Sequence, residues 1–144
     1  MKNINFKAKP SGTKIENAIA RFDWNRPNRP YEFFIGNNVR INYLEDTTQI
    51  FATYIENIHW VVLNIPNTYT DGNYQIITSQ ESHDGKEGIV FAHVMGQEFF
   101  SGDHSSSMSI KRGENLKHTF TFSGIHIQGF NTLNGLIEFD HKPP

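Results

Sequence analysis

Histidine is the residue type in this sequence with the most obvious capacity for chemistry. Seven histidines occur, and six of them, from His83 to His141, lie in the C-terminal half of the chain. A metal site needs three or four ligands that converge within a few ångströms, usually with a close pair on one element. No His-x-His or His-x-x-x-His pair is present. We therefore predict no metal site and no cofactor, and we expect His83-Asp84 and Asp103-His104 to be exposed loop residues.

His118 differs from the other histidines because it lies in a strongly alternating segment. One face of the expected strand carries Leu116, His118, Phe120 and Phe122, and the other face carries lysine and threonine. His118 therefore points in the same direction as the core residues. Two interpretations stay open: a hydrogen-bonded histidine near the end of a sheet, or a histidine that lines an internal cavity. In the second case His118 is the candidate for a ligand pocket.

Basic and aromatic residues are interleaved between residues 21 and 34. They are Arg21, Trp24, Arg26, Arg29, Tyr31 and Phe33. Such a surface suits a single nucleic-acid strand, an acidic protein or a sugar. The net charge of −2, from 13 Lys+Arg and 15 Asp+Glu, does not favour nucleic acid. We predict a loop at 23–30, and we expect Trp24, Arg26 and Arg29 in it, together with Tyr31 directly after it, to bind a protein or a glycan. The alternative is that Trp24 packs onto the sheet while the arginines face water.

Motifs for catalysis are weak in this sequence. It has no cysteine and no Gly-x-Ser-x-Gly motif, and its nine Glu and six Asp cannot be ranked as catalytic pairs. The segment from Asn67 to Asp71-Gly72 is similar to the start of a calcium-binding loop, but Thr78 stands where a bidentate Glu is required. The sequence therefore favours a protein that is not an enzyme, and no catalytic residue is assigned.

The elements that would position these residues are short strands separated by turn residues. Strands are expected at 4–8, 31–35, 39–44, 48–55, 58–65, 74–78, 89–94, 97–101, 107–111, 116–123, 125–130 and 136–139. The segment 14–21 is open between a short helix and a bulged strand. Gly36-Asn37-Asn38 and Met95-Gly96 are expected to close hairpins, the second of which would place His93 opposite Glu98.

These elements predict an all-β fold for the whole chain, 1–144, as one domain. Sixteen Ile and twelve Phe against five Ala favour strands over helices. The spacing of the turns predicts a single antiparallel β-sandwich of about ten short strands with at most one short helix. A lipocalin-like β-barrel is the alternative. Trp60-Val61-Val62-Leu63 lacks polar alternation, and we expect it to form a central strand that is covered on both faces.

A series of strand motifs also resembles a known class of domains. The motifs are Phe6-Lys7-Ala8, Leu63-Asn64-Ile65-Pro66, Gly72-Asn73-Tyr74-Gln75-Ile76, Ser107-Met108-Ser109-Ile110, Phe120-Thr121-Phe122-Ser123-Gly124 and Asn134-Gly135-Leu136-Ile137-Glu138-Phe139. Their order is similar to small secreted bacterial β-sandwich domains, often lipoproteins, of unknown function. The resemblance implies a fold and an exported location, but no activity.

Two functions and two locations follow from these patterns. The first function is a non-enzymatic interaction module that binds a protein or glycan through the arginine-rich loop. The alternative is a carrier of a small apolar ligand with an internal pocket near His118. The composition favours a secreted or periplasmic protein, with a cytoplasmic protein as the alternative, because residues 1–10 contain no signal peptide. No apolar stretch is long enough for a membrane helix.

Overall fold

The computed structural model describes residues 9–25, 32–55, 59–77, 84–95, 98–99, 107–112, 117–127 and 131–140. These residues form twelve strands and no helix, so the all-β prediction is confirmed. The strands are β1 (Thr13–Ile15), β2 (Ala18–Asn25), β3 (Glu32–Gly36), β4 (Asn38–Tyr43), β5 (Thr47–Ile55), β6 (His59–Pro66), β7 (Gly72–Ile77), β8 (Ile89–Met95), β9 (Glu98–Phe99), β10 (Ser107–Arg112), β11 (Lys117–Ile127) and β12 (Asn131–Asp140).

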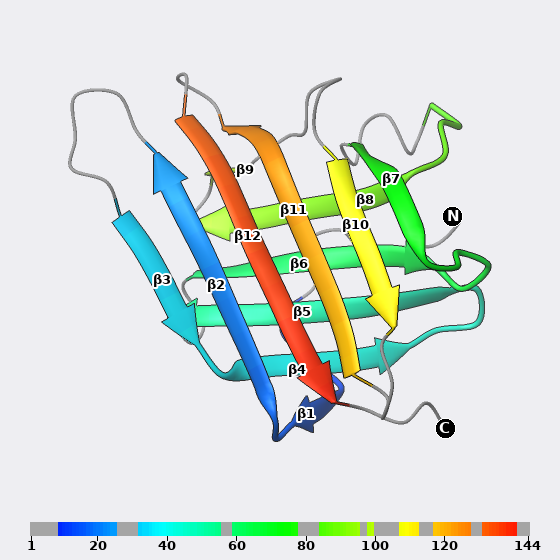
Figure 1. Cartoon of the computed structure of the whole chain (residues 1–144), viewed down its shortest axis with the longest axis horizontal. Helices are drawn as coiled ribbons and strands as arrows, with labels where there is room; N and C mark the ends of the chain where they lie inside the picture. The colour runs from blue at the N-terminus through cyan, green and yellow to red at the C-terminus, as the bar shows by residue number, and fades with distance from the viewer. Residues whose placement is uncertain are drawn as a thin grey trace.

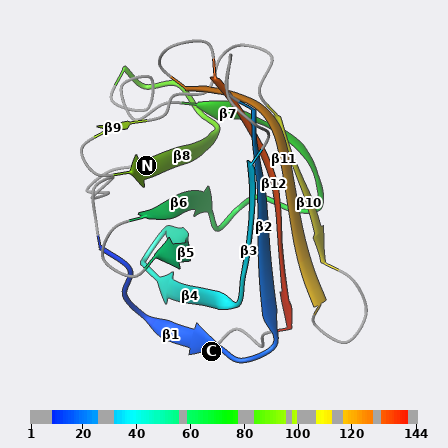
Figure 2. The same ribbon diagram turned by 90° about the vertical axis from the view of Figure 1, so that its left-hand side faces the viewer.

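The described strands belong to one continuous sheet, and the predicted two-sheet sandwich is wrong. Their order is β1-β4-β5-β6-β8-β7-β10-β11-β12-β2-β3, and β9 pairs with β8. The sheet curls so strongly that its two halves face each other as crossed layers (Figures 1 and 2). Because β1 and β3 lie at the two ends of this path, the described sheet is a half-barrel and not the closed lipocalin-like barrel either.

Strand β7 is the physical reason why the two layers are joined. Its first four residues pair with β10 in an antiparallel ladder, from Gly72 opposite Ile110 to Gln75 opposite Ser107. Its last two residues, Ile76 and Ile77, pair in parallel with β8. A strand that changes partners along its length forms a corner between layers. All other strand pairs in the described sheet are antiparallel.

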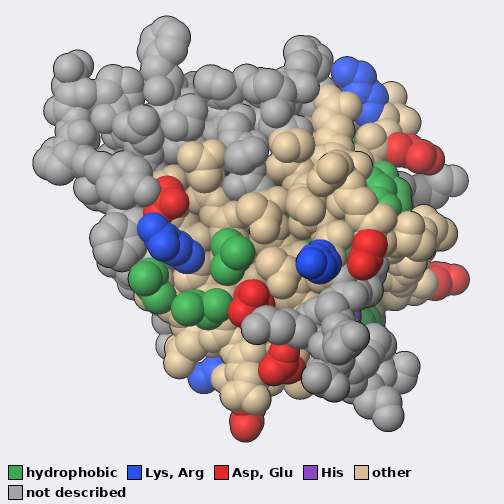
Figure 3. Space-filling model, in the orientation of Figure 1, with side chains coloured by type: hydrophobic (Ala, Val, Ile, Leu, Met, Phe, Trp, Pro, Cys, Tyr) green, Lys and Arg blue, Asp and Glu red, His purple; other side chains and the backbone are tan. Residues whose placement is uncertain are grey.

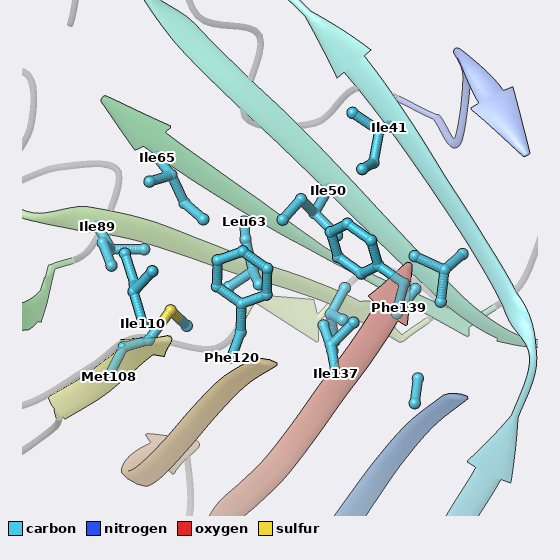
Figure 4. Packing of buried hydrophobic residues seen from close by; sticks show 14 of the residues in the cluster. Ile41, Ile50, Leu63, Ile65, Ile89, Met108, Ile110, Phe120, Ile137 and Phe139 are labelled. Carbon is cyan, nitrogen blue, oxygen red and sulfur yellow. The ribbon is translucent and has the colours of Figure 1, made fainter. Parts of the chain in front are cut away.

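The main core lies between the two layers. Phe120 and Ile137 from one layer point toward Ile50, Leu63 and other aliphatic residues of the opposite layer (Figure 4). Strand periodicity explains this arrangement, because alternate residues of each strand face the same side. On the described face of the β2–β12–β11 layer that points away from the core, hydrophobic and charged side chains are few, and backbone and other side chains make up most of the surface (Figure 3).

Strand β6 has the central position that its uninterrupted apolar sequence predicts. It lies between β5 and β8. Val61 and Leu63 belong to the interlayer core, whereas Trp60 and Val62 form a second buried cluster with Phe51 and Ala92 on the opposite face. Both faces of β6 are therefore covered, which confirms this part of the prediction.

A row of side-chain amides, with Gln49 and Asn64 buried and Asn42 half-buried, crosses the same face as the second cluster. Asn42, Gln49 and Asn64 lie opposite one another on β4, β5 and β6. The amide of Gln49 donates a 2.9 Å hydrogen bond to Oδ1 of Asn64, and Nδ2 of Asn42 lies 3.4 Å from Oε1 of Gln49. Buried polar side chains are tolerated where they bond to one another. This row helps to fix the register of the three strands.

Residues 14–21 form no helix, and they belong to two strands separated by Glu16-Asn17 instead of one bulged strand. The backbone of β1 pairs with β4, and that of β2 pairs with β12 and β3. Ala20 and Phe22 are buried, whereas Ile19 between them is 43% exposed. A helix would have placed Ile15, Ile19 and Phe22 on one buried face. Sheet pairing on both sides of β2 overrides that local pattern.

Two expected hairpins are also corrected by the structure. Strands β3 and β4 do not pair with each other, because the chain passes from one layer to the other at Asn37. Strands β8 and β9 do pair, but with Met95 opposite Glu98, so His93 does not face Glu98. The observed register also places Val94 opposite Phe99, where Val94 opposite Gln97 was expected.

Strands β11 and β12 are longer than their sequence suggests. The expected break between 116–123 and 125–130 is a β-bulge, because Ser123 and Gly124 lie between two paired positions, Phe122 opposite Gly135 and Ile125 opposite Leu133. Residues 131–135, expected as a loop, begin β12. The bulge lets Ser123-Gly124 remain within a continuous strand.

Strand β3 forms one free end of the sheet. It pairs with β2 and with no other described strand. Its sequence is Glu-Phe-Phe-Ile-Gly, and the side chain of Ile35 is 54% exposed. Ile35 lies opposite Arg21, on the same outer face as the exposed Ile19. This end of the sheet therefore carries apolar side chains on its outer surface.

Candidate functional site

A cavity of about 310 Å³ lies between the two layers, where the ends of several strands meet. The β4–β5 hairpin closes beside it, with Tyr43 opposite Thr48, and β6 ends there at Pro66. From the other layer come the start of β11 and the end of β12. The described lining residues are Ile41, Tyr43, Thr48, Ile50, Ile65, Pro66, Asn67, His118, Phe120 and Phe139.

The deep part of the cavity is apolar. Ile41, Ile50, Ile65, Phe120 and Phe139 are all buried. The rings of Phe120 and Phe139 stack with their centroids 5.6 Å apart, and Figure 4 shows both rings pointing toward the isoleucines of the opposite layer. The floor therefore offers apolar surface from both layers to any molecule that enters.

The rim of the cavity is polar. Tyr43 and Asn67 are exposed, and Thr48 and His118 are half-buried. The hydroxyl of Thr48 donates a 2.7 Å hydrogen bond to Oδ1 of Asn67. The backbone N–H of Asn67 donates to the carbonyl of Asp46, at 2.9 Å, which ties the rim to the β4–β5 turn. This side of the rim is thus built from the two connections that follow β4 and β6.

His118 lies at the boundary between the rim and the floor. Its ring lies 5.2 Å from the ring of Phe139, tilted by 39°. Phe139 is directly opposite His118 in the β11–β12 ladder. The alternation that placed His118 on the inward face explains its position beside Phe120. Its role as a ligand contact stays a prediction.

The phenol of Tyr43 is shifted toward its protonated form. Partial burial raises the pKa of Tyr43 above its ordinary value, because removal from water penalises the phenolate. Tyr43 therefore presents a neutral hydroxyl to the rim throughout the neutral pH range. Tyrosine hydroxyls of this kind both donate and accept hydrogen bonds.

The loop predicted to bind a protein or glycan is only partly described. Trp24 belongs to β2, where it pairs with Leu133 and Glu32, so its expected position in a loop is wrong. The strand continues because both neighbours supply backbone partners. Arg26, Arg29 and Tyr31 lie outside the described residues. Whether these four residues bind a partner stays a prediction.

The histidine and aspartate pairs considered for metal binding fall mostly outside the described chain. His83, Asp103 and His104 are not described, and Asp84 is exposed. Among the described residues, no group of three or more His, Asp or Glu side chains is placed to hold a metal ion.

Sequence reasoning did not single out Tyr43 and Thr48, and it considered Asn67 only as the start of a segment similar to a calcium-binding loop. All three lie beside turns, and of the three only Asn67 is of a type that dominates at turns. Only the pairing of β4 with β5 and of β5 with β6 brings them to one rim. A polar residue at a strand end next to an inward-facing aliphatic one is the signal that could have indicated them.

Comparison of the chain with protein-family models, with curated proteins and with solved structures finds no match. The described residues contain no helix that is long and apolar enough to span a membrane. The resemblance to secreted lipoprotein-type domains therefore stays an expectation from the sequence, although the sandwich fold that it implied is not observed. The geometry of the cavity is the basis for assigning a function.

Proposed function

We propose that this protein binds a small apolar molecule in the cavity between the layers of the half-barrel. The observation that carries the proposal is the cavity itself: about 310 Å³, with a buried floor of isoleucine and phenylalanine and a rim of polar side chains. Ligand pockets are commonly apolar, with a few polar groups that orient the ligand, and range upward from about 300 Å³. This cavity lies at the small end of that range.

Of the two functions expected from the sequence, we favour the carrier of a small ligand over the interaction module. A cavity beside His118 supports a carrier, and one of about 310 Å³ lies there between the layers. The chemistry of the described lining suits binding better than a reaction, since it contains one imidazole and one phenol but no carboxylate pair. The residues on which the interaction module depends lie largely outside the described chain.

A variant that fills the cavity tests the proposal. Thr48 lies on the lining and is half-buried, so Thr48→Phe should place a ring in the cavity without replacing a core residue. Thr48→Val is the matched control, because it also removes the hydroxyl that bonds to Asn67 but adds no bulk. Both variants should unfold at temperatures close to that of the parent protein.

Binding would be followed by NMR titration with a panel of small apolar compounds: indole, 2-naphthol, geraniol and decanoate. We expect at least one compound to shift the backbone amides of the cavity strands in the parent and in Thr48→Val, and to lose this effect in Thr48→Phe. The proposal fails if no compound shifts these amides, or if Thr48→Phe binds as well as Thr48→Val does.

A further inference from the structure

The two walls of the cavity differ in chemistry. The β11–β12 wall contributes three rings, those of His118, Phe120 and Phe139. Phe139 lies between the other two, at 5.2 Å from His118 and 5.6 Å from Phe120. The opposite wall contributes Ile41, Ile50, Ile65 and Pro66, and it carries the polar Tyr43, Thr48 and Asn67 at the rim. A flat molecule between these walls would contact rings on one side and methyl groups on the other.

The described lining carries no formal charge. Lys, Arg, Asp and Glu are all missing from the ten described lining residues. The raised pKa of Tyr43 keeps its phenol neutral as well. An ionised group without a partner is costly to remove from water. A charged ligand would therefore lose hydration in this cavity without gaining a counter-charge from the described residues.

The volume limits the size of the molecule. An apolar cavity of about 150 Å³ accommodates benzene, so about 310 Å³ corresponds to two such rings. Aromatic ligands pack well against phenylalanine in offset or tilted arrangements, and such contacts add to the effect of burying apolar area. The polar rim provides the place where a hydroxyl or carbonyl group of the ligand can stay hydrated.

Resting on the proposed function, we propose that the ligand is an uncharged aromatic molecule of about two rings with one polar group at the rim. The rings would lie against Phe139 and Phe120, and the polar group would lie near Tyr43 and His118. Charge, size and aromatic character are three separate properties of this class, so each can be varied by itself.

A series of compounds on one skeleton tests charge and size. At pH 8, dissociation constants would be measured by calorimetry for 2-naphthol, 2-naphthoate and 2-naphthylmethylammonium. We expect both ions to bind about tenfold or more weakly than 2-naphthol. We also expect 1-pyrenemethanol, which has four rings, to show no binding. Equal affinity for either ion, or tight binding of the pyrene compound, would overturn the inference.

A saturated analogue tests the aromatic wall. Decahydro-2-naphthol has the skeleton of 2-naphthol without its π-system, and we expect the parent protein to prefer 2-naphthol by about threefold or more. Phe139→Leu keeps an apolar wall but removes the central ring, and it should abolish this preference. If this variant does not fold, the preference of the parent still decides the matter. Equal binding of the two alcohols by the parent refutes the aromatic class.

The outcomes separate this inference from the proposed function. If the ions or the saturated alcohol bind as well as 2-naphthol and Thr48→Phe abolishes their binding, the cavity is a ligand site and only the ligand class is wrong. If no compound of the series binds, both the proposed function and the ligand class are refuted.

Discussion

Trp60 lies in β6 on the face that points away from the interlayer core. It is 7% exposed and packs in a cluster with Phe51, Val62 and Ala92. Large aromatic side chains bury more apolar area than any other type, so each one dominates the energetics of its cluster. The stability of the β4–β8 layer therefore depends on this second cluster as well as on the main core.

Replacing Trp60 with alanine should destabilise the protein strongly. We expect Trp60→Ala to lower the free energy of unfolding by about 3–5 kcal/mol, because it leaves a cavity in a closely packed cluster. Urea denaturation measures this change. Trp60→Phe serves as the control and should cost much less, since most of the buried apolar area is kept. A loss below about 1 kcal/mol for the alanine variant would contradict the position assigned to Trp60.

The junction between β7 and β8 joins the two layers. Gly88 is buried immediately before β8. A Cβ atom at Gly88 would lie 2.8 Å from Cγ2 of Ile77 and 2.9 Å from the carbonyl oxygen of Gln75. Only glycine permits such a close approach to the neighbouring strand. The parallel pairing of Ile77 with Val90 depends on this approach.

We predict that Gly88→Ala destabilises the fold by about 1–3 kcal/mol, because the methyl group forces the two strands apart. Gly85 provides a matched control on the same connection. Its φ is +86°, but a Cβ there would meet nothing within 4 Å, so Gly85→Ala should cost about 1 kcal/mol from backbone strain alone. Urea denaturation of both variants distinguishes the two effects. A Gly88→Ala protein as stable as the parent would argue against the tight junction.

The strands themselves could be predicted from the sequence, whereas several of their partners could not. Alternation and turn residues were enough to locate β4, β5 and the turn between them, since these signals are local. Gly36-Asn37-Asn38 carries an equally good turn signal, yet β3 and β4 lie in different layers. Local turn chemistry does not specify whether a chain reverses within one layer or crosses to the other, because that choice depends on distant pairings.

The candidate site could also be predicted only in part, because its residues come together through distant strand pairings. The inward direction of His118 follows from the period of two along its strand. The meeting of His118 with Tyr43 and Thr48 depends on the curl of the whole sheet, which brings β11 over β4 and β5. The curl arises from the change of partners within β7. The sequence of the six residues of β7 does not predict this change.

One curled sheet supplies both the core and the cavity. The isoleucines and phenylalanines that line the cavity floor also belong to the main core. The shape of the cavity therefore depends on how the two layers pack against each other. We expect the proposed site to be preformed, so that a ligand can occupy it without rearrangement of the strands.

The free end of the sheet at β3 has a consequence for behaviour at high concentration. Edge strands invite pairing between molecules, and natural proteins commonly protect them with lysine or proline. β3 contains neither, its Ile35 is half exposed, and β2 is its only partner among the described strands. Two molecules could thus extend their sheets across this edge and begin to aggregate.

Ile35→Lys should suppress such aggregation without loss of stability, because the lysine lies on the surface and disfavours pairing of like edges. Light scattering of concentrated samples measures the effect. Ile19→Lys changes an exposed isoleucine on the same face, but on β2, which has partners on both sides, and should have a smaller effect. If both lysine variants reduce scattering equally, the apolar surface and not the strand edge drives the self-association, and storage of the protein would call for masking that surface instead.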